Sequence, residues 1–168
     1  MRRSGAVVVV VGLLAACGTG DSTPPNTTPP TGPTTTAAAT VEQFAFIRDI
    51  DATSLTFDPA EILTGEEARR AAVEAGVIAE GEDLPNDFFI DNPDEATTVA
   101  SLSPDTEYML LGFDTNGAIQ EQTVDSATFV AVVIGGSEQY YGIVPGEVPA
   151  NLALSGDVVT AVEQVYFP

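Results

Sequence analysis

A threonine- and proline-rich tract, GTGDSTPPNTTPPTGPTTTAAAT, occupies residues 18–40 and separates the start of the chain from the rest. It holds almost no side chain that a hydrophobic core could bury, so we expect a disordered, partly polyproline-like linker there. The compact fold is therefore restricted to residues 41–168. That length suits a single domain with one core.

The residues before the linker have the layout of a secretory signal. A basic pair at residues 2 and 3 precedes an apolar run over residues 6–16, and this run is shorter than the roughly 20 residues that a membrane span needs. The run ends in LAAC, which resembles the lipobox of bacterial lipoproteins. The resemblance implies that residues 1–16 are a signal peptide and that Cys17 carries a thioether-linked diacylglycerol. The alternative is an ordinary signal that is cut near residue 16 and leaves a free thiol.

The composition narrows the possible chemistry. The chain has 25 acidic and 5 basic residues, no histidine, and a single cysteine. All five basic residues are arginine, so lysine is absent as well as histidine. The chain therefore lacks the usual bases for a serine nucleophile, the nitrogen and thiolate ligands of zinc sites, and a Schiff-base amine. The excess of acid also argues against nucleic acid as a partner. One cysteine cannot form an internal disulfide, so packing must hold the domain together.

The domain begins with a hairpin pattern. Residues 42–51 (EQFAFIRDID) alternate, with Phe44, Phe46 and Ile50 expected on one face, and SLTF follows after a tight turn at residues 51–54.

The acids that follow the hairpin are interpreted as helix caps. Pro59, with Asp58 before it and Glu61 two residues after it, indicates one helix start. Thr64, with Glu67 three residues later, is a capping box that opens a helix ending at Gly76. Carboxylates that accept backbone N–H groups have a lowered pKa and are poor proton carriers. We assign four acids to capping: Asp58, Glu61, Glu66 and Glu67.

The remaining elements are mostly extended. An Asn-Gly turn at residues 116–117 joins two strands, and residues 126–134 form either a helix, which we favour weakly, or a buried strand. Further strands are expected at residues 88–90, 97–102, 107–113, 118–124, 140–144 and 158–167, with a proline- and glycine-bearing loop between the last two. The sequence therefore predicts an α+β fold: a mainly antiparallel sheet, curled into a small β-barrel, with one or two short helices.

Three acids near the middle of the chain suggest a cation site. Asp91, Asp94 and Glu95 crowd one turn and offer the oxygen ligands that calcium prefers. The twelve-residue calcium loop pattern is missing, and the Asn-Pro pair at residues 92–93 is itself enough to form a turn.

A second set of residues suggests an active site or a contact surface. Asp87, Asp91 and Glu95 beside Tyr140 and Tyr141 are the candidates for glycan hydrolysis by two carboxylates. Alternatively, the two tyrosines offer a contact point for a partner, although neighbours on a strand face opposite sides and at least one should be in the core.

Three phrases carry a resemblance: FDPAEILTGEEARRAA, LPNDFFIDN and the terminal VVTAVEQVYFP. Together they resemble a small domain of uncharacterised bacterial lipoproteins and secreted proteins, over residues 42–168. The resemblance implies a hairpin that leads into a helix and a chain that ends in a strand, and it implies no established activity. Ile62 stands where an aromatic residue is expected, and Asp91 stands where a basic residue is usual.

These observations favour a non-catalytic protein that is lipid-anchored on the extracytoplasmic face of the membrane. It would need no cofactor and would bind an envelope protein or a wall polymer. The alternatives are a small carboxylate-dependent, glycan-directed hydrolase and a calcium-binding surface domain.

Overall fold

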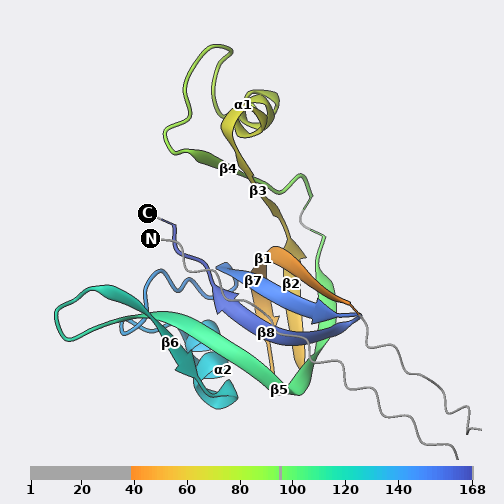
Figure 1. Cartoon of the computed structure of the whole chain (residues 1–168), viewed down its shortest axis with the longest axis vertical. Helices are drawn as coiled ribbons and strands as arrows, with labels where there is room; N and C mark the ends of the chain where they lie inside the picture. The colour runs from red at the N-terminus through yellow and green to blue at the C-terminus, as the bar shows by residue number, and fades with distance from the viewer. Residues whose placement is uncertain (1–38, 95, 168) are drawn as a thin grey trace, which may run out of the picture. The chain divides into compact units, whose positions relative to one another are not determined.

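The computed structural model describes residues 39–94 and 96–167 (Figure 1). The predicted signal peptide, the lipidated Cys17 and nearly all of the predicted linker lie outside these residues. In chain order the elements are β1 (Thr40–Ile50), β2 (Ser54–Pro59), β3 (Glu61–Thr64), α1 (Gly65–Glu74), β4 (Phe88–Asp91), β5 (Thr98–Phe113), β6 (Ile119–Val124), α2 (Ser126–Gly135), β7 (Val148–Ser155) and β8 (Val158–Gln164).

Five strands form a closed barrel, which confirms the predicted α+β class and the small barrel. The strand order is β2-β1-β7-β8-β5, pairing of β2 with β5 closes the circle, and β6 is added to the free side of β5. All of these pairs are antiparallel except β5 with β8, which is parallel. Closure leaves the barrel strands without an open edge.

The β1–β2 hairpin forms as predicted, but its inward face differs from the prediction. Ala45 and Ile47 are fully buried, whereas Phe44 and Phe46 lie on the other face and are only half-buried. The register shifts between Ile47 and Asp49, so a bulge at this point returns Ile50 to the inward face. The prediction that Phe44, Phe46 and Ile50 share one face is therefore wrong.

One long strand, β5, replaces the two strands expected at residues 97–102 and 107–113. Its first part pairs with β2, its last part pairs with β6, and its register against β8 shifts between Leu102 and Glu107. The hydroxyl of Thr106 donates to the Val159 carbonyl of β8 at 2.9 Å inside this irregular stretch. The irregularity lets a single strand close the barrel and then continue into the β6 hairpin.

Residues 126–135 form the helix α2, so of the two alternatives for this segment the helix is confirmed. The Asp125 carboxylate accepts the Thr128 N–H at 2.7 Å and caps α2. Phe129 of α2 is completely buried and lies 4.8 Å from the Tyr108 ring, centroid to centroid. The helix thus contributes directly to the barrel core.

The prediction for the end of the chain was wrong in one place. Residues 140–144 form turns around a single bridge between Gly112 and Tyr140, and the strand lies later, at β7, where a loop was expected. In β7 the side chains of Val148, Ala150 and Leu152 are buried at every second position. Pro149 is tolerated near the strand start, where its carbonyl accepts the Val165 N–H.

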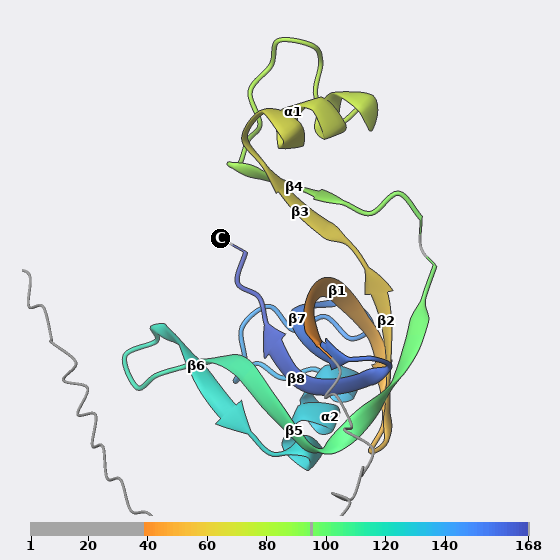
Figure 2. The same cartoon turned by 45° about the vertical axis from the view of Figure 1, so that its right-hand side comes forward.

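Residues 61–91 form a lobe outside the barrel, which we call the outer lobe (Figures 1 and 2). In it, β3 and β4 pair only with each other, and α1 packs on them through Ala68 and Ala72. The predicted helix end at Gly76 is confirmed by the left-handed φ of 72° at that residue.

Two capping assignments in this region were wrong. Asp58 lies in β2 and Glu61 in β3, so neither acid begins a helix. Glu66 and Glu67 do lie in the first turn of α1, and Thr64 is its N-cap residue, but the Thr64 side chain makes no capping hydrogen bond. Within residues 39–94 and 96–167, no helix is long and apolar enough to cross a lipid bilayer.

Candidate functional site

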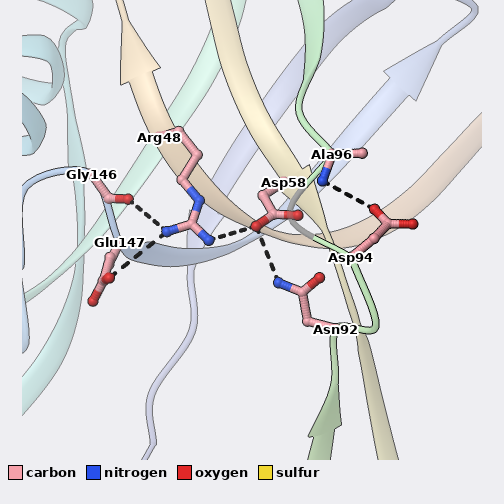
Figure 3. Close-up of polar contacts among 7 residues, drawn as sticks. All are labelled: Arg48, Asp58, Asn92, Asp94, Ala96, Gly146 and Glu147. Carbon is pink, nitrogen blue, oxygen red and sulfur yellow. Dashed lines mark hydrogen bonds and ion pairs between the residues drawn. The ribbon is translucent and has the colours of Figure 1, made fainter.

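A buried ion pair lies where the barrel meets the outer lobe. The bulge in β1 directs Arg48 towards Asp58 of β2, and Arg48 Nη2 donates to Asp58 Oδ2 at 2.5 Å (Figure 3). The Asp58 side chain is fully buried, and that of Arg48 is 27% exposed. Arg48 also donates to the Gly146 carbonyl at 3.1 Å, and Glu147 lies 3.9 Å away with a largely exposed side chain.

The segment that follows the outer lobe contributes a third member to this group. Asn92, directly after β4, donates from Nδ2 to Asp58 Oδ2 at 3.1 Å. The other oxygen of each side chain, Asp58 Oδ1 and Asn92 Oδ1, is buried and has no hydrogen-bond partner among the described residues. We call Arg48, Asp58 and Asn92 the polar junction.

The polar junction keeps Asp58 ionised. Burial raises the pKa of its carboxyl group, but the hydrogen bonds from Arg48 and Asn92, together with the charge of Arg48, outweigh burial and hold the pKa below its usual 3.8. Asp58 is therefore a structural anion and not a proton donor at neutral pH.

The acids predicted to hold a cation do not form a cluster by themselves. Asp91 ends β4, Asp94 accepts the Ala96 N–H at 3.0 Å, and Glu95 lies outside the described residues. Across residues 39–94 and 96–167, no group of three histidine, cysteine or acidic side chains is arranged to hold a metal.

A second candidate site is an aromatic groove, which residues of the outer lobe and of the segment after β8 line. It has a volume of about 600 Å³ and lies between β3, the start of β4 and the residues after β8. The Phe88 and Phe167 rings stack in it at 5.1 Å, and Tyr166 is 48% exposed. Ile62 forms part of its wall, and among the described residues that line it Asp87 is the one that carries a charge.

More aromatic rings surround this groove. Phe44 on the outward face of β1 meets Phe167 edge-on at 5.9 Å, and Tyr141 lies against Tyr166 at 5.1 Å. The Tyr141 hydroxyl donates to the Phe167 carbonyl at 2.8 Å and fixes the last residues of the chain. Such rings provide large contact areas with little loss of side-chain entropy.

The two tyrosines singled out from the sequence have different environments. Tyr140 is 9% exposed and belongs to the core, whereas Tyr141 is half-buried and contacts the groove residues Tyr166 and Phe167. The prediction that at least one would be in the core is confirmed. The tyrosine most available to a partner near the groove is Tyr166, which sequence reasoning missed.

The residues proposed for hydrolysis are separated. Asp87 lines the aromatic groove, Asp91 lies at the far end of β4 in a different cavity with Glu42 and Glu61, and Tyr140 is in the barrel core. Together with Glu95, which is not described, they do not make one site in the described part of the chain.

No protein-family model, curated protein or solved structure matches this chain. The resemblance to a lipoprotein domain stays a prediction, and the functional argument depends on the geometry of the polar junction and the aromatic groove.

Proposed function

We propose that this protein is a non-catalytic binding module of the bacterial cell envelope, tethered to the outside of the cell membrane by lipid on Cys17. It binds an envelope protein through the aromatic groove. The observation that supports this most is the groove itself, in which an exposed Tyr166 and the stacked Phe88 and Phe167 line an open apolar surface. The signal-like start and the linker support the tether.

The charge around the groove indicates the kind of segment it accepts. None of the described residues that line the groove is basic, and Asp87 is at its wall. The whole chain has a formal net charge of −20. The three arginines in the described residues all lie within 4 Å of a carboxylate. An extended polypeptide with apolar side chains and flanking Lys or Arg would match both the apolar surface and the negative field.

Four of the acids have structural roles in the fold. Backbone hydrogen bonds from the turns lower the pKa of Asp51 to about 2 and also lower those of Asp114 and Asp125. With Asp58 in the polar junction, these carboxylates act as turn-forming, capping or ion-paired groups.

The tether is tested by metabolic labelling of cells with an alkyne-bearing fatty acid. The wild-type chain should take up the label and fractionate with membranes, and Cys17→Ala should do neither. Label on the C17A variant, or a wild-type chain released as a free protein, would contradict the anchor without bearing on the groove.

The groove is tested by titrating the purified protein with fluorescent peptides. An extended peptide of leucine, proline and arginine is compared with one in which glutamate replaces each arginine. We expect the cationic peptide to bind at least tenfold more tightly, more weakly at high salt, and to lose most of its affinity to Tyr166→Ala. The control Val99→Ala, an exposed position on β5 at 66% exposure, should bind like wild type. Equal binding by both peptides, or preferential capture of wall glycan strands, would refute the peptide assignment.

A further inference from the structure

Two buried oxygen atoms at the polar junction lack a donor. Asp58 Oδ2 accepts from both Arg48 and Asn92, while Asp58 Oδ1 and Asn92 Oδ1 accept from no group among the described residues. In Figure 3 both atoms point away from Arg48, towards the chain segment that contains Asp94. The Asn92 amide is oriented by its bond to Asp58, so exchanging its oxygen and nitrogen would break that bond.

The acids next to Asn92 in the chain can only accept hydrogen bonds when ionised. Asp94 accepts the Ala96 N–H through one of its carboxylate oxygens and offers further lone pairs. Asp91 precedes Asn92 in the chain and faces Glu61 across the β3–β4 ladder, a like-charge pair that is unfavourable by itself. Arg48 is the one cation in the group, and it contacts Oδ2 on the opposite side of the Asp58 carboxylate.

We propose that a hard divalent cation, with calcium as the best fit, binds between Asp58 Oδ1 and Asn92 Oδ1. Carboxylate and amide oxygens are calcium ligands, and the flexible coordination of calcium allows water to fill the other positions. The cation satisfies both unpartnered acceptors together, which no side chain of the described residues does.

The site would join two parts of the fold. Asp58 belongs to β2 of the barrel, and Asn92 follows β4 of the outer lobe. A cation held by both therefore links β2 to the segment that leads from the outer lobe back into the barrel. With one fully buried carboxylate as its main ligand, the site should resemble weak extracellular calcium sites, with dissociation constants of about 10⁻⁴–10⁻³ M.

The test is a calcium titration of the purified full-length protein after EDTA treatment. Isothermal calorimetry should show one site in the submillimolar to millimolar range, with magnesium weaker, since magnesium loses its water less readily. By mass action, calcium at 100 times the dissociation constant should raise the melting temperature by about 5–10 °C. Sodium chloride at equal ionic strength controls for screening of the acidic surface.

Variants assign the binding to this site. Asn92→Ser removes one of the two oxygens and should weaken calcium binding at least tenfold, and Asp58→Asn should abolish it. Asp105→Asn makes the same charge change at an exposed position on β5 and should bind like wild type. If Asp58→Asn fails to fold, Asn92→Ser alone decides.

If about 10 mM calcium produces neither calorimetric heat nor a thermal shift, the proposal is overturned and water is the partner of these oxygens. Unchanged binding by Asn92→Ser would also overturn it.

Discussion

Replacing Arg48 with methionine removes the charge that compensates Asp58 and keeps most of the side-chain volume. Asp58 is fully buried, and Asn92 would be its remaining hydrogen-bond donor. Breaking a buried ion pair from one side costs about 3–5 kcal/mol. Because Arg48 is 27% exposed and the carboxyl group can escape its charge by taking up a proton, we expect a loss of about 2–4 kcal/mol at pH 7.

The pH dependence should separate this mechanism from a simple packing defect. In the wild type the Asp58 pKa is below 3.8, so the pair contributes fully above that pH and is lost as the pH falls through the lowered pKa. In Arg48→Met, burial is opposed only by Asn92, and the Asp58 pKa should rise above 3.8. The folded variant then binds a proton before the unfolded chain does, so its deficit shrinks as the pH falls from 7 to 4.

The assay is urea unfolding followed by far-UV circular dichroism at pH 7 and pH 4. Asp58→Asn should cost less than Arg48→Met, about 1–2 kcal/mol, because the arginine left behind still reaches the Gly146 carbonyl and solvent. The double variant should recover about 1–2 kcal/mol relative to the sum of the single losses. A loss below about 1 kcal/mol for Arg48→Met, or an equal loss at both pH values, would refute the reasoning.

Three further predictions concern the framework. In the wild type, the Asp51 carboxylate takes up a proton as the pH falls from 3.8 to about 2, and the stability from its turn hydrogen bonds is lost over that interval. Asp51→Asn has no such group, so it should lose less stability there, and parallel acid-unfolding curves would contradict this. Gln164→Leu should cost about 2–4 kcal/mol of unfolding free energy in urea, because the Gln164 side chain, in a residue only 4% exposed, accepts the Leu111 N–H and donates to the Tyr141 carbonyl. A loss below about 1 kcal/mol would argue against those bonds. Gly112→Ala would place a Cβ 2.3 Å from the Gln122 side chain and should cost about 1 kcal/mol, which Gln122→Ala should remove; a cost that persists in the double variant would indicate backbone strain instead.

Local features of the sequence predicted the Asn-Gly turn and favoured the helix α2 over a buried strand. The Asp114 carboxylate accepts the Asn116 and Ala118 N–H groups in the Asn-Gly turn, and Asp125 caps α2. In each case the residues that determine the conformation are neighbours in the chain, so their pattern is visible without the fold.

Asp58 shows where local reasoning fails. An acid before proline is a reasonable helix start, but the partners of Asp58 are Arg48, ten residues earlier, and Asn92, 34 residues later. The ion pair and the β1 ladder hold the segment extended, and tertiary contacts override the local preference. The bulge near Arg48 likewise reversed the assignment of Phe44 and Phe46, because a single extra residue exchanges the two faces of a strand.

The aromatic groove could not be derived from the sequence for the same reason. Phe88 and Phe167 are far apart in the chain, and nothing in either local pattern indicates that the rings stack. The terminal phrase VYFP did offer one clue, since it places two aromatic residues beyond the last strand, where no barrel core requires them. The β7 strand also escapes prediction, because Pro149 is typical of a loop and only edge or terminal strand positions tolerate it.

The most direct test of the binding role is site-specific photocrosslinking in living cells. A benzophenone side chain at position 166 should form a discrete adduct with an envelope protein, and the adduct should disappear when free cationic peptide is added in excess. The same probe at Val144, a position 52% exposed and outside the groove, should form no such adduct. Equal crosslinking at both positions, or none at position 166 in a folded and membrane-bound chain, would contradict the proposed function.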